Sequence, residues 1–247
     1  MSTIFKAIHP IFGRADKLLG LGYQQRSPYY WWWEYLRRNE DYATCCANGG
    51  EGELAELFER FGDVSNDNFK DWWSKDSRGF RLFAEKPLPI KLAELDEPSQ
   101  WDASWTKDGV MVVAVPLNIS KRDIQKVFAQ LLKKRHLGKR GRKALSDSSA
   151  STARFPLHRS VSIHTLRVQL AVYDAVMANK SAPKKRTLAQ IGADLKLVPS
   201  ARANRDDEID DAASKRNVMG ATVSRHFRAA QRIVANTARG QFPNSGD

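Results

Sequence analysis

The chain has 247 residues, 42% of them hydrophobic and 10% aromatic, so it can form one large folded domain or two ordinary ones. Residues 1–120 hold 14 Lys and Arg against 18 Asp and Glu, whereas residues 121–247 hold 26 against 10, an asymmetry that predicts a polyanionic partner for the second half. No apolar run approaches the ~20 residues that span a bilayer and the two cysteines are adjacent, so we expect a cytoplasmic protein with reduced thiols and no membrane segment.

The first strong pattern is an aromatic helix that begins after Ser27, a good N-cap residue, with Pro28 at the first helical position. One helical face carries the large side chains of Tyr29, Trp32, Trp33 and Leu36. The flanks carry Tyr30, Trp31 and Tyr35. Two further helices are expected at residues 54–61, ended by Gly62, and at 69–73. Most of these rings are expected in a core, and some on a surface for a protein partner or for self-association.

Two strands are expected next, at residues 80–85 and, because it is continuously apolar, at 110–115. A helix with one apolar face should follow from Ser120 to about His136. Residues 1–138 are therefore predicted to form a mixed helix and strand domain, used for protein interaction or as a scaffold. With the helical C-terminal part described below, the fold class is α-rich α+β.

Residues 139–160 are predicted to be a basic, flexible linker, since a run of positive charge is followed by small polar residues. Four of its side chains are candidate DNA contacts: Lys139, Arg140, Arg142 and Lys143. The Arg-Gly-Arg core resembles an AT-hook, which implies an arm in a minor groove, although the flanking prolines of that motif are missing here. The alternative is that the linker contacts phosphates only.

Residues 161–240 are predicted to be entirely helical, followed by a disordered tail at 241–247. One helix is defined by Leu166, Leu170, Tyr173 and Met177. Thr187 and Gln190 have the spacing of a capping box and open a short second helix. The last helix is expected from about residue 218 to 239, with Val223 and Phe227 facing inward.

The last helix carries Thr-Val-Ser-Arg-His-Phe-Arg at residues 222–228, which resembles the recognition helices of bacterial helix-turn-helix regulators. The resemblance covers about 50 residues and implies that the helices at 187–196 and 218–239 bind DNA. The candidate DNA contacts on these two helices are Thr187, Thr222, Ser224, Arg225, Arg228 and Arg232. The arginines share one helical face and suit guanine O6 and N7, while the hydroxyls, expected near the helix N-terminus, suit phosphates or base edges. Together with the aromatic opening of the chain, this ending is similar to uncharacterised proteins of phages and conjugative elements.

Some 20 residues separate the two helices, where the motif usually has a turn of three or four. Five carboxylates lie within residues 206–211 of this insertion. Either the insertion loops out, or the residues from Ser200 onward form a helix of their own. In the first case the carboxylates would lie near Arg225 and Arg228 and could pair with them in the free protein.

No catalytic motif is present: there is no nucleophile elbow, phosphate loop or zinc-protease signature, and His158 and His164 lack a third ligand nearby. We therefore expect no enzyme, no cofactor and no metal site. The sequence favours a sequence-specific protein that binds double-stranded DNA, either a transcription regulator or a DNA-directed accessory factor of a bacterial mobile element. The alternatives are a non-specific architectural or packaging protein and an RNA-binding protein or nuclease.

Overall fold

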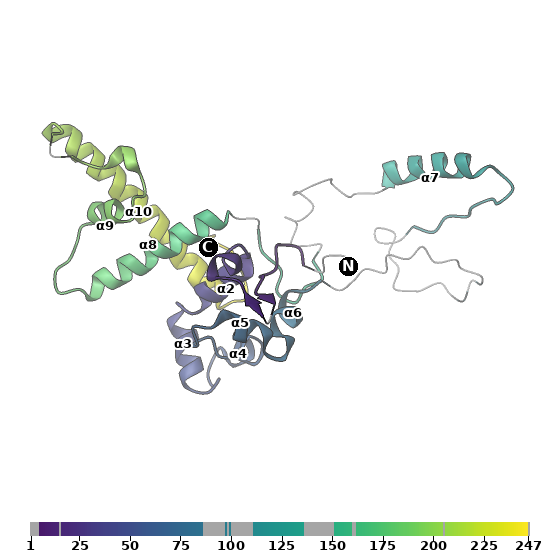
Figure 1. Ribbon diagram of the computed structural model, residues 1–247, viewed down its shortest axis with the longest axis horizontal. Helices are drawn as coiled ribbons and strands as arrows, with labels where there is room; N and C mark the ends of the chain where they lie inside the picture. The colour runs from purple at the N-terminus through teal and green to yellow at the C-terminus, as the bar shows by residue number, and fades with distance from the viewer. Residues whose placement is uncertain are drawn as a thin grey trace. The chain divides into compact units, whose positions relative to one another are not determined.

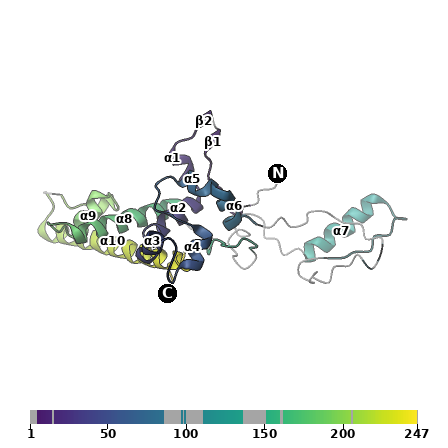
Figure 2. The ribbon, with the colours of Figure 1, turned by 90° about the horizontal axis from the view of Figure 1, so that it is seen from below.

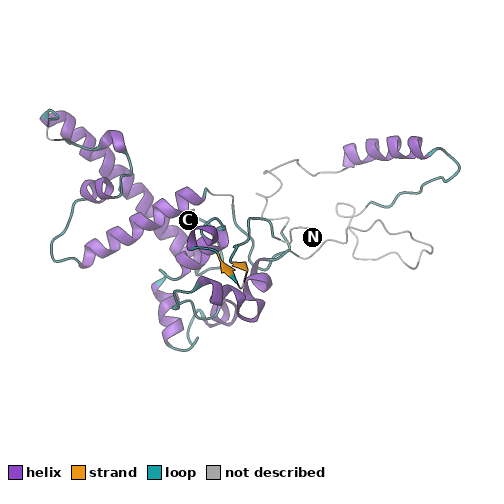
Figure 3. Cartoon of the chain, in the orientation of Figure 1, coloured by secondary structure: helices purple, strands orange, loops and turns teal. Residues whose placement is uncertain are grey.

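The computed structural model describes residues 5–14, 16–85, 97, 99, 111–135, 151–159, 162–204 and 206–246. Over these residues the chain is rich in helix, as predicted, with one small antiparallel pair of strands, β1 (Gly13–Arg14) and β2 (Lys17–Leu18) (Figures 1 and 3). No helix in this described part is long and apolar enough to cross a membrane. The chain divides into two compact units, one made of Met1–Lys86 with Leu145–Asp247 and the other of Pro87–Ala144.

The helices of the first unit come from both ends of the chain. Its N-terminal segment contributes α1 (Leu21–Gln24), α2 (Pro28–Leu36), α3 (Glu40–Ala47), α4 (Ala55–Phe61), α5 (Phe69–Ser74) and α6 (Arg78–Phe83). Its C-terminal segment contributes α8 (Ile163–Ser181), α9 (Leu188–Asp194) and α10 (Ile209–Thr237). In both ribbon views α8 and α10 run side by side with α9 against them (Figures 1 and 2).

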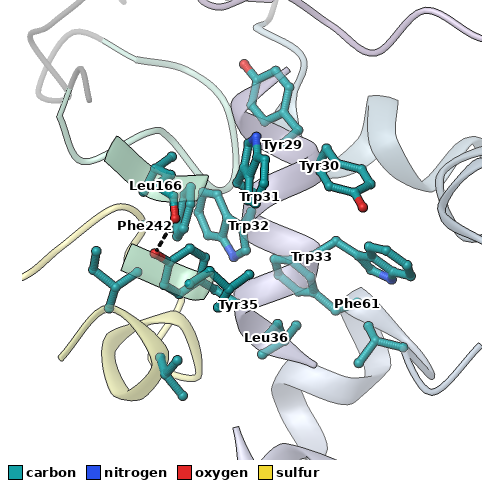
Figure 4. Close-up of a cluster of buried hydrophobic side chains, with 14 of the residues drawn as sticks. Tyr29, Tyr30, Trp31, Trp32, Trp33, Tyr35, Leu36, Phe61, Leu166 and Phe242 are labelled. Carbon is teal, nitrogen blue, oxygen red and sulfur yellow. Dashed lines mark hydrogen bonds between the residues drawn. The ribbon is translucent and has the colours of Figure 1, made fainter. Parts of the chain in front are cut away.

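The aromatic helix α2 lies at the centre of the core. It begins as predicted, because Ser27 Oγ accepts a hydrogen bond from the Tyr29 amide at 3.3 Å and Pro28 takes the first helical position. Every residue from Tyr29 to Leu36 is buried, including the three rings that we expected on its flanks (Figure 4). The flank assignment is therefore wrong, because helices from both segments of the unit contact α2 and leave it no exposed side. Burial of these rings also removes the observation that suggested an aromatic interaction surface.

The two segments of this unit share one hydrophobic core. The Tyr35 hydroxyl donates to the Leu166 carbonyl at 3.0 Å (Figure 4). Asn39 Nδ2 donates to the Val234 carbonyl at 3.3 Å. The Phe242 ring lies 5.3 Å from the Trp32 ring, centroid to centroid. These contacts cross the boundary that we predicted between residues 1–138 and 161–240, so the compact units do not follow that division.

A charged network joins α2 to α8 beside this core. Glu34 accepts a hydrogen bond from the Tyr30 hydroxyl at 2.6 Å and another from Arg38. The other arm of Arg38 donates to Asp174 of α8 at 2.9 Å. Burial lowers the pKa of Arg38, but the hydrogen bond to Asp174 and the charge of Glu34 outweigh burial and the pKa is raised. The guanidinium therefore stays charged and pairs with both carboxylates.

Both predicted strands are corrected by the structure. Residues 80–83 belong to α6, because Gly79, Leu82 and Phe83 are buried at helical spacing while Phe80 is exposed. The described residues of the second prediction, 111–115, lie outside any helix or strand. Met111, Val112 and Val115 are exposed there, and no strand of the described chain pairs with them.

The second unit contains α7 (Lys121–Arg135), which matches the helix predicted from Ser120. Its apolar face is not buried as expected, since Val127 is 53% exposed and Ile124 and Phe128 are only half-buried. Among the described residues of this unit, which are 97, 99 and 111–135, no second helix or strand covers that face.

The last helix begins earlier than predicted and the tail after it is packed. Helix α10 starts at Ile209 rather than near residue 218 and continues without a break to Thr237. Asp210 and Asp211 occupy its first turn, where carboxylates stabilise a helix, and Ala212 and Ala213 are strong helix formers. Beyond α10, Phe242 is fully buried, so residues 241–246 are not the disordered tail that we expected.

Candidate nucleic-acid interface

Helix α9 packs closely against α10. The predicted capping box is present: Thr187 Oγ1 accepts from the Gln190 amide at 3.2 Å, and Gln190 Oε1 accepts from the Thr187 amide at 2.8 Å. A Cβ atom on Gly192 would lie 2.6–2.8 Å from the side chains of Met219 and Val223. Only glycine therefore permits this approach of the two helices.

The buried side of α10 determines which side is exposed. Val223 is fully buried in a small cluster with Ile191 of α9 and two valines of α8. One turn further, the Phe227 ring stacks on Tyr173 at 5.7 Å between centroids. Since Val223 and Phe227 face α8 and α9 as predicted, the opposite side of α10 faces solvent.

Three predicted arginines come together on that exposed side. Arg225, Arg228 and Arg232 line a shallow hollow of about 540 Å³. The other lining residues are Ala221, Ser224, Ala229 and Ser245. Arg232 Nη1 donates to the Ser245 carbonyl at 3.5 Å. Within the part of the chain that the structure describes, Arg225 and Arg228 have no carboxylate within 4 Å, so their charges are available to an anionic ligand.

Of the three predicted hydroxyl contacts, only Ser224 lines the same hollow as the arginines. Ser224 lines the hollow, but the Thr222 hydroxyl donates to the Val218 carbonyl at 2.9 Å, and Thr187 lies on α9 outside the hollow. Because α10 starts at Ile209, Thr222 and Ser224 lie in the middle of the helix. The expectation that they sit at its positive N-terminal end is therefore wrong.

The acidic run lies at the far end of α10 from Arg225. Asp207 Oδ1 accepts a hydrogen bond from Lys215 Nζ at 2.5 Å, which lowers the pKa of Asp207. Asp211 precedes Arg225 by 14 residues, or roughly 21 Å along the helix axis. This is more than twice the Debye length of about 8 Å at physiological salt. The predicted pairing of the acidic run with the arginines is thus corrected: Asp210 and Asp211 lie in the first turn of a continuous helix.

The four basic linker residues that we predicted to bind DNA, Lys139, Arg140, Arg142 and Lys143, lie outside the described residues. They remain a prediction.

Two residues of this region were missed from the sequence. Ser245 lines the hollow because Phe242 anchors the segment before it, and the Phe-Pro pair in a polar tail was the signal for this anchor. His226 follows Arg225 on α10. Burial lowers the pKa of its imidazole, and the charge of Arg225 lowers it further, so His226 adds no positive charge to the face at neutral pH.

No group of three or more His, Cys, Asp or Glu side chains in the described ranges could hold a metal ion. Comparisons of this chain with protein-family models, with curated proteins and with solved structures found no match.

Proposed function

We propose that this chain is a sequence-specific protein that binds double-stranded DNA through the exposed side of α10. The observation that carries the proposal is the cluster of Arg225, Arg228 and Arg232 on one side of a helix whose other side is buried. An α-helix fits the major groove, where arginine binds guanine O6 and N7 in a bidentate manner and also pairs with phosphates. The excess of positive charge after residue 120 supports the same ligand.

In this proposal α9 and α10 are the two helices of a helix-turn-helix unit, with α10 as the recognition helix. The close packing at Gly192 supports this pairing of helices. The connection between them is longer than the usual turn, since it runs from residue 195 to 208 and contains a short 3-10 helix at Pro199–Ala201. The biological role that we infer is transcription regulation, or another DNA-directed step in a bacterial mobile element.

The proposal predicts that Arg225→Ala and Arg228→Ala each weaken binding to a selected DNA sequence by roughly 1–3 kcal/mol and relax the preference at one base position. The sequence is obtained by selecting bound fragments from a random pool, and affinities are measured by fluorescence anisotropy. Arg216→Ala is the matched control, because Arg216 is exposed on the same helix, but the helical repeat places it on the side opposite the arginines. The proposal is wrong if no fragment is enriched, or if both variants bind like the control.

The linker is expected to add affinity without adding specificity. Changing Lys139, Arg140, Arg142 and Lys143 to Gln should weaken binding to every sequence alike. It should also reduce the dependence of log K on log salt by up to about 0.9 per lost phosphate contact. Titrations at three salt concentrations measure this slope. A loss confined to A·T-rich sites would show instead that the linker reads the minor groove, and an unchanged slope would show that it makes no contact.

A further inference from the structure

The exposed side of α10 extends well beyond its arginines. Because the helix begins at Ile209, the face that carries Arg225 continues toward the N-terminus at spacings of three and four residues. In chain order this face consists of Asp210, Ser214, Asn217, Ala221, Arg225, Arg228 and Arg232. All of these residues are exposed. From the sequence, the N-terminal half of this face was expected to lie outside the last helix, either in a loop or in a helix of its own.

The C-terminal end of this face is partly covered by the chain's own tail. Asn236 Nδ2 donates to the carbonyls of Asn244 and Gly246 at 3.1 and 3.0 Å. Ser245 lies against Arg232 and also accepts a hydrogen bond from Arg159. A helix with its side chains is about 10–12 Å wide and the major groove is about 12 Å wide, so a helix with a second chain segment beside it does not fit. The tail therefore keeps this end of α10 out of the groove.

The N-terminal end of the face is limited by charge. Asp210 lies in the first turn of α10 with Asp211 beside it, and the other carboxylates of the acidic run precede them. Carboxylates repel DNA phosphates, so the groove-facing segment must begin after this turn. Between the two limits lie Ser214, Asn217, Ala221, Arg225 and Arg228.

We propose that this middle segment reads the bases, with Asn217 as a specificity-determining residue, and that Arg232 contacts the DNA backbone. The inference rests on the proposed function. The exposed side-chain amide of Asn217 makes no hydrogen bond within the described chain, so it can pair with adenine N6 and N7. It precedes Arg225 by eight residues, or about 12 Å, which corresponds to roughly three or four base pairs. Arg232, held by the Ser245 carbonyl at the covered end, faces a phosphate together with Arg159.

The test compares Asn217→Ala with Arg232→Ala in the full chain on the selected sequence and its single base-pair variants. Asn217→Ala should weaken binding to the selected sequence by about 5- to 150-fold and relax preference at one base pair, with an unchanged salt slope. Arg232→Ala should weaken binding to all sequences by the same factor and lower the slope by about 0.9. Gln231→Ala is the control, since it removes an exposed amide of α10 that lies off this face.

The inference is overturned if Asn217→Ala leaves the base preferences intact, or if Arg232→Ala relaxes one of them. Circular dichroism checks that each variant is folded. We expect the helix to be kept, because alanine has a high helix propensity at exposed positions. The proposed function is tested separately by the same data. If the wild-type chain selects a sequence and Arg225→Ala loses it, but Asn217→Ala does not, only the inference about Asn217 is overturned.

Discussion

Phe242→Ala is expected to lower the free energy of unfolding by about 3–5 kcal/mol, which is typical of removing a large aromatic side chain from a core. The Phe242 ring is fully buried and lies 5.3 Å from Trp32 and 5.6 Å from Tyr35, centroid to centroid. Its carbonyl accepts a hydrogen bond from the His158 amide at 2.7 Å, so the backbone is held as well. The substitution leaves a cavity beside the central helix α2.

Urea unfolding followed by tryptophan fluorescence measures this loss. Gln241→Ala is the control, because the preceding residue is exposed and its truncation removes no core contact. Surface substitutions usually change stability by less than about 0.5 kcal/mol. If Phe242→Ala lowered the free energy of unfolding no more than the control does, the tail would be detached from the core in solution, as its polar composition first suggested.

Val218→Pro is expected to lower the free energy of unfolding by about 3 kcal/mol or more, because α10 is continuous through this residue. In a helix that began at residue 218, as the sequence suggested, proline would occupy the first position, where it is well tolerated. Inside α10 it removes the hydrogen bond from residue 218 to the Ser214 carbonyl, and its ring clashes with that carbonyl. Val218 is 50% exposed, so little of the loss comes from packing.

The control for this prediction is Val218→Ala, which shortens the same side chain and keeps the amide hydrogen. Thermal unfolding followed by circular dichroism at 222 nm reports both stability and helix content. A proline variant as stable and as helical as the alanine variant would place the start of the helix near residue 218 and would remove Asn217 from the groove-facing surface.

The parts of the fold that could be predicted are those specified by neighbouring residues. Ser27 with Pro28, and Thr187 with Gln190, satisfy helix N-termini through contacts within a few residues, so the starts of α2 and α9 followed directly from the sequence. The exposure of Arg225 and Arg228 followed from the helical repeat, because Val223 and Phe227 had to be buried.

The parts that could not be predicted depend on distant residues. The full burial of α2 requires rings and carbonyls from residues after 150, such as Phe242 and the Leu166 backbone. Residues 80–83 are apolar enough for a strand, and only the packing of Gly79 against Trp73 and the burial of Leu82 and Phe83 select a helix. The start of α10 was missed because the acidic run was assigned to an insertion between two helices, whereas carboxylates are favourable in a first helical turn.

The shared core has a consequence for the order in which this chain folds. The Tyr35 hydroxyl and the Leu166 carbonyl are 131 residues apart in the sequence, and the unit that joins them is interrupted by Pro87–Ala144. Contacts of such long sequence separation form only after a large loss of chain entropy, which slows folding. During synthesis the aromatic residues of α2 emerge long before Phe242, so they must remain without their final partners until the ribosome has passed residue 242. We expect the nascent chain to be most prone to aggregate during this interval, because its large apolar side chains are then exposed.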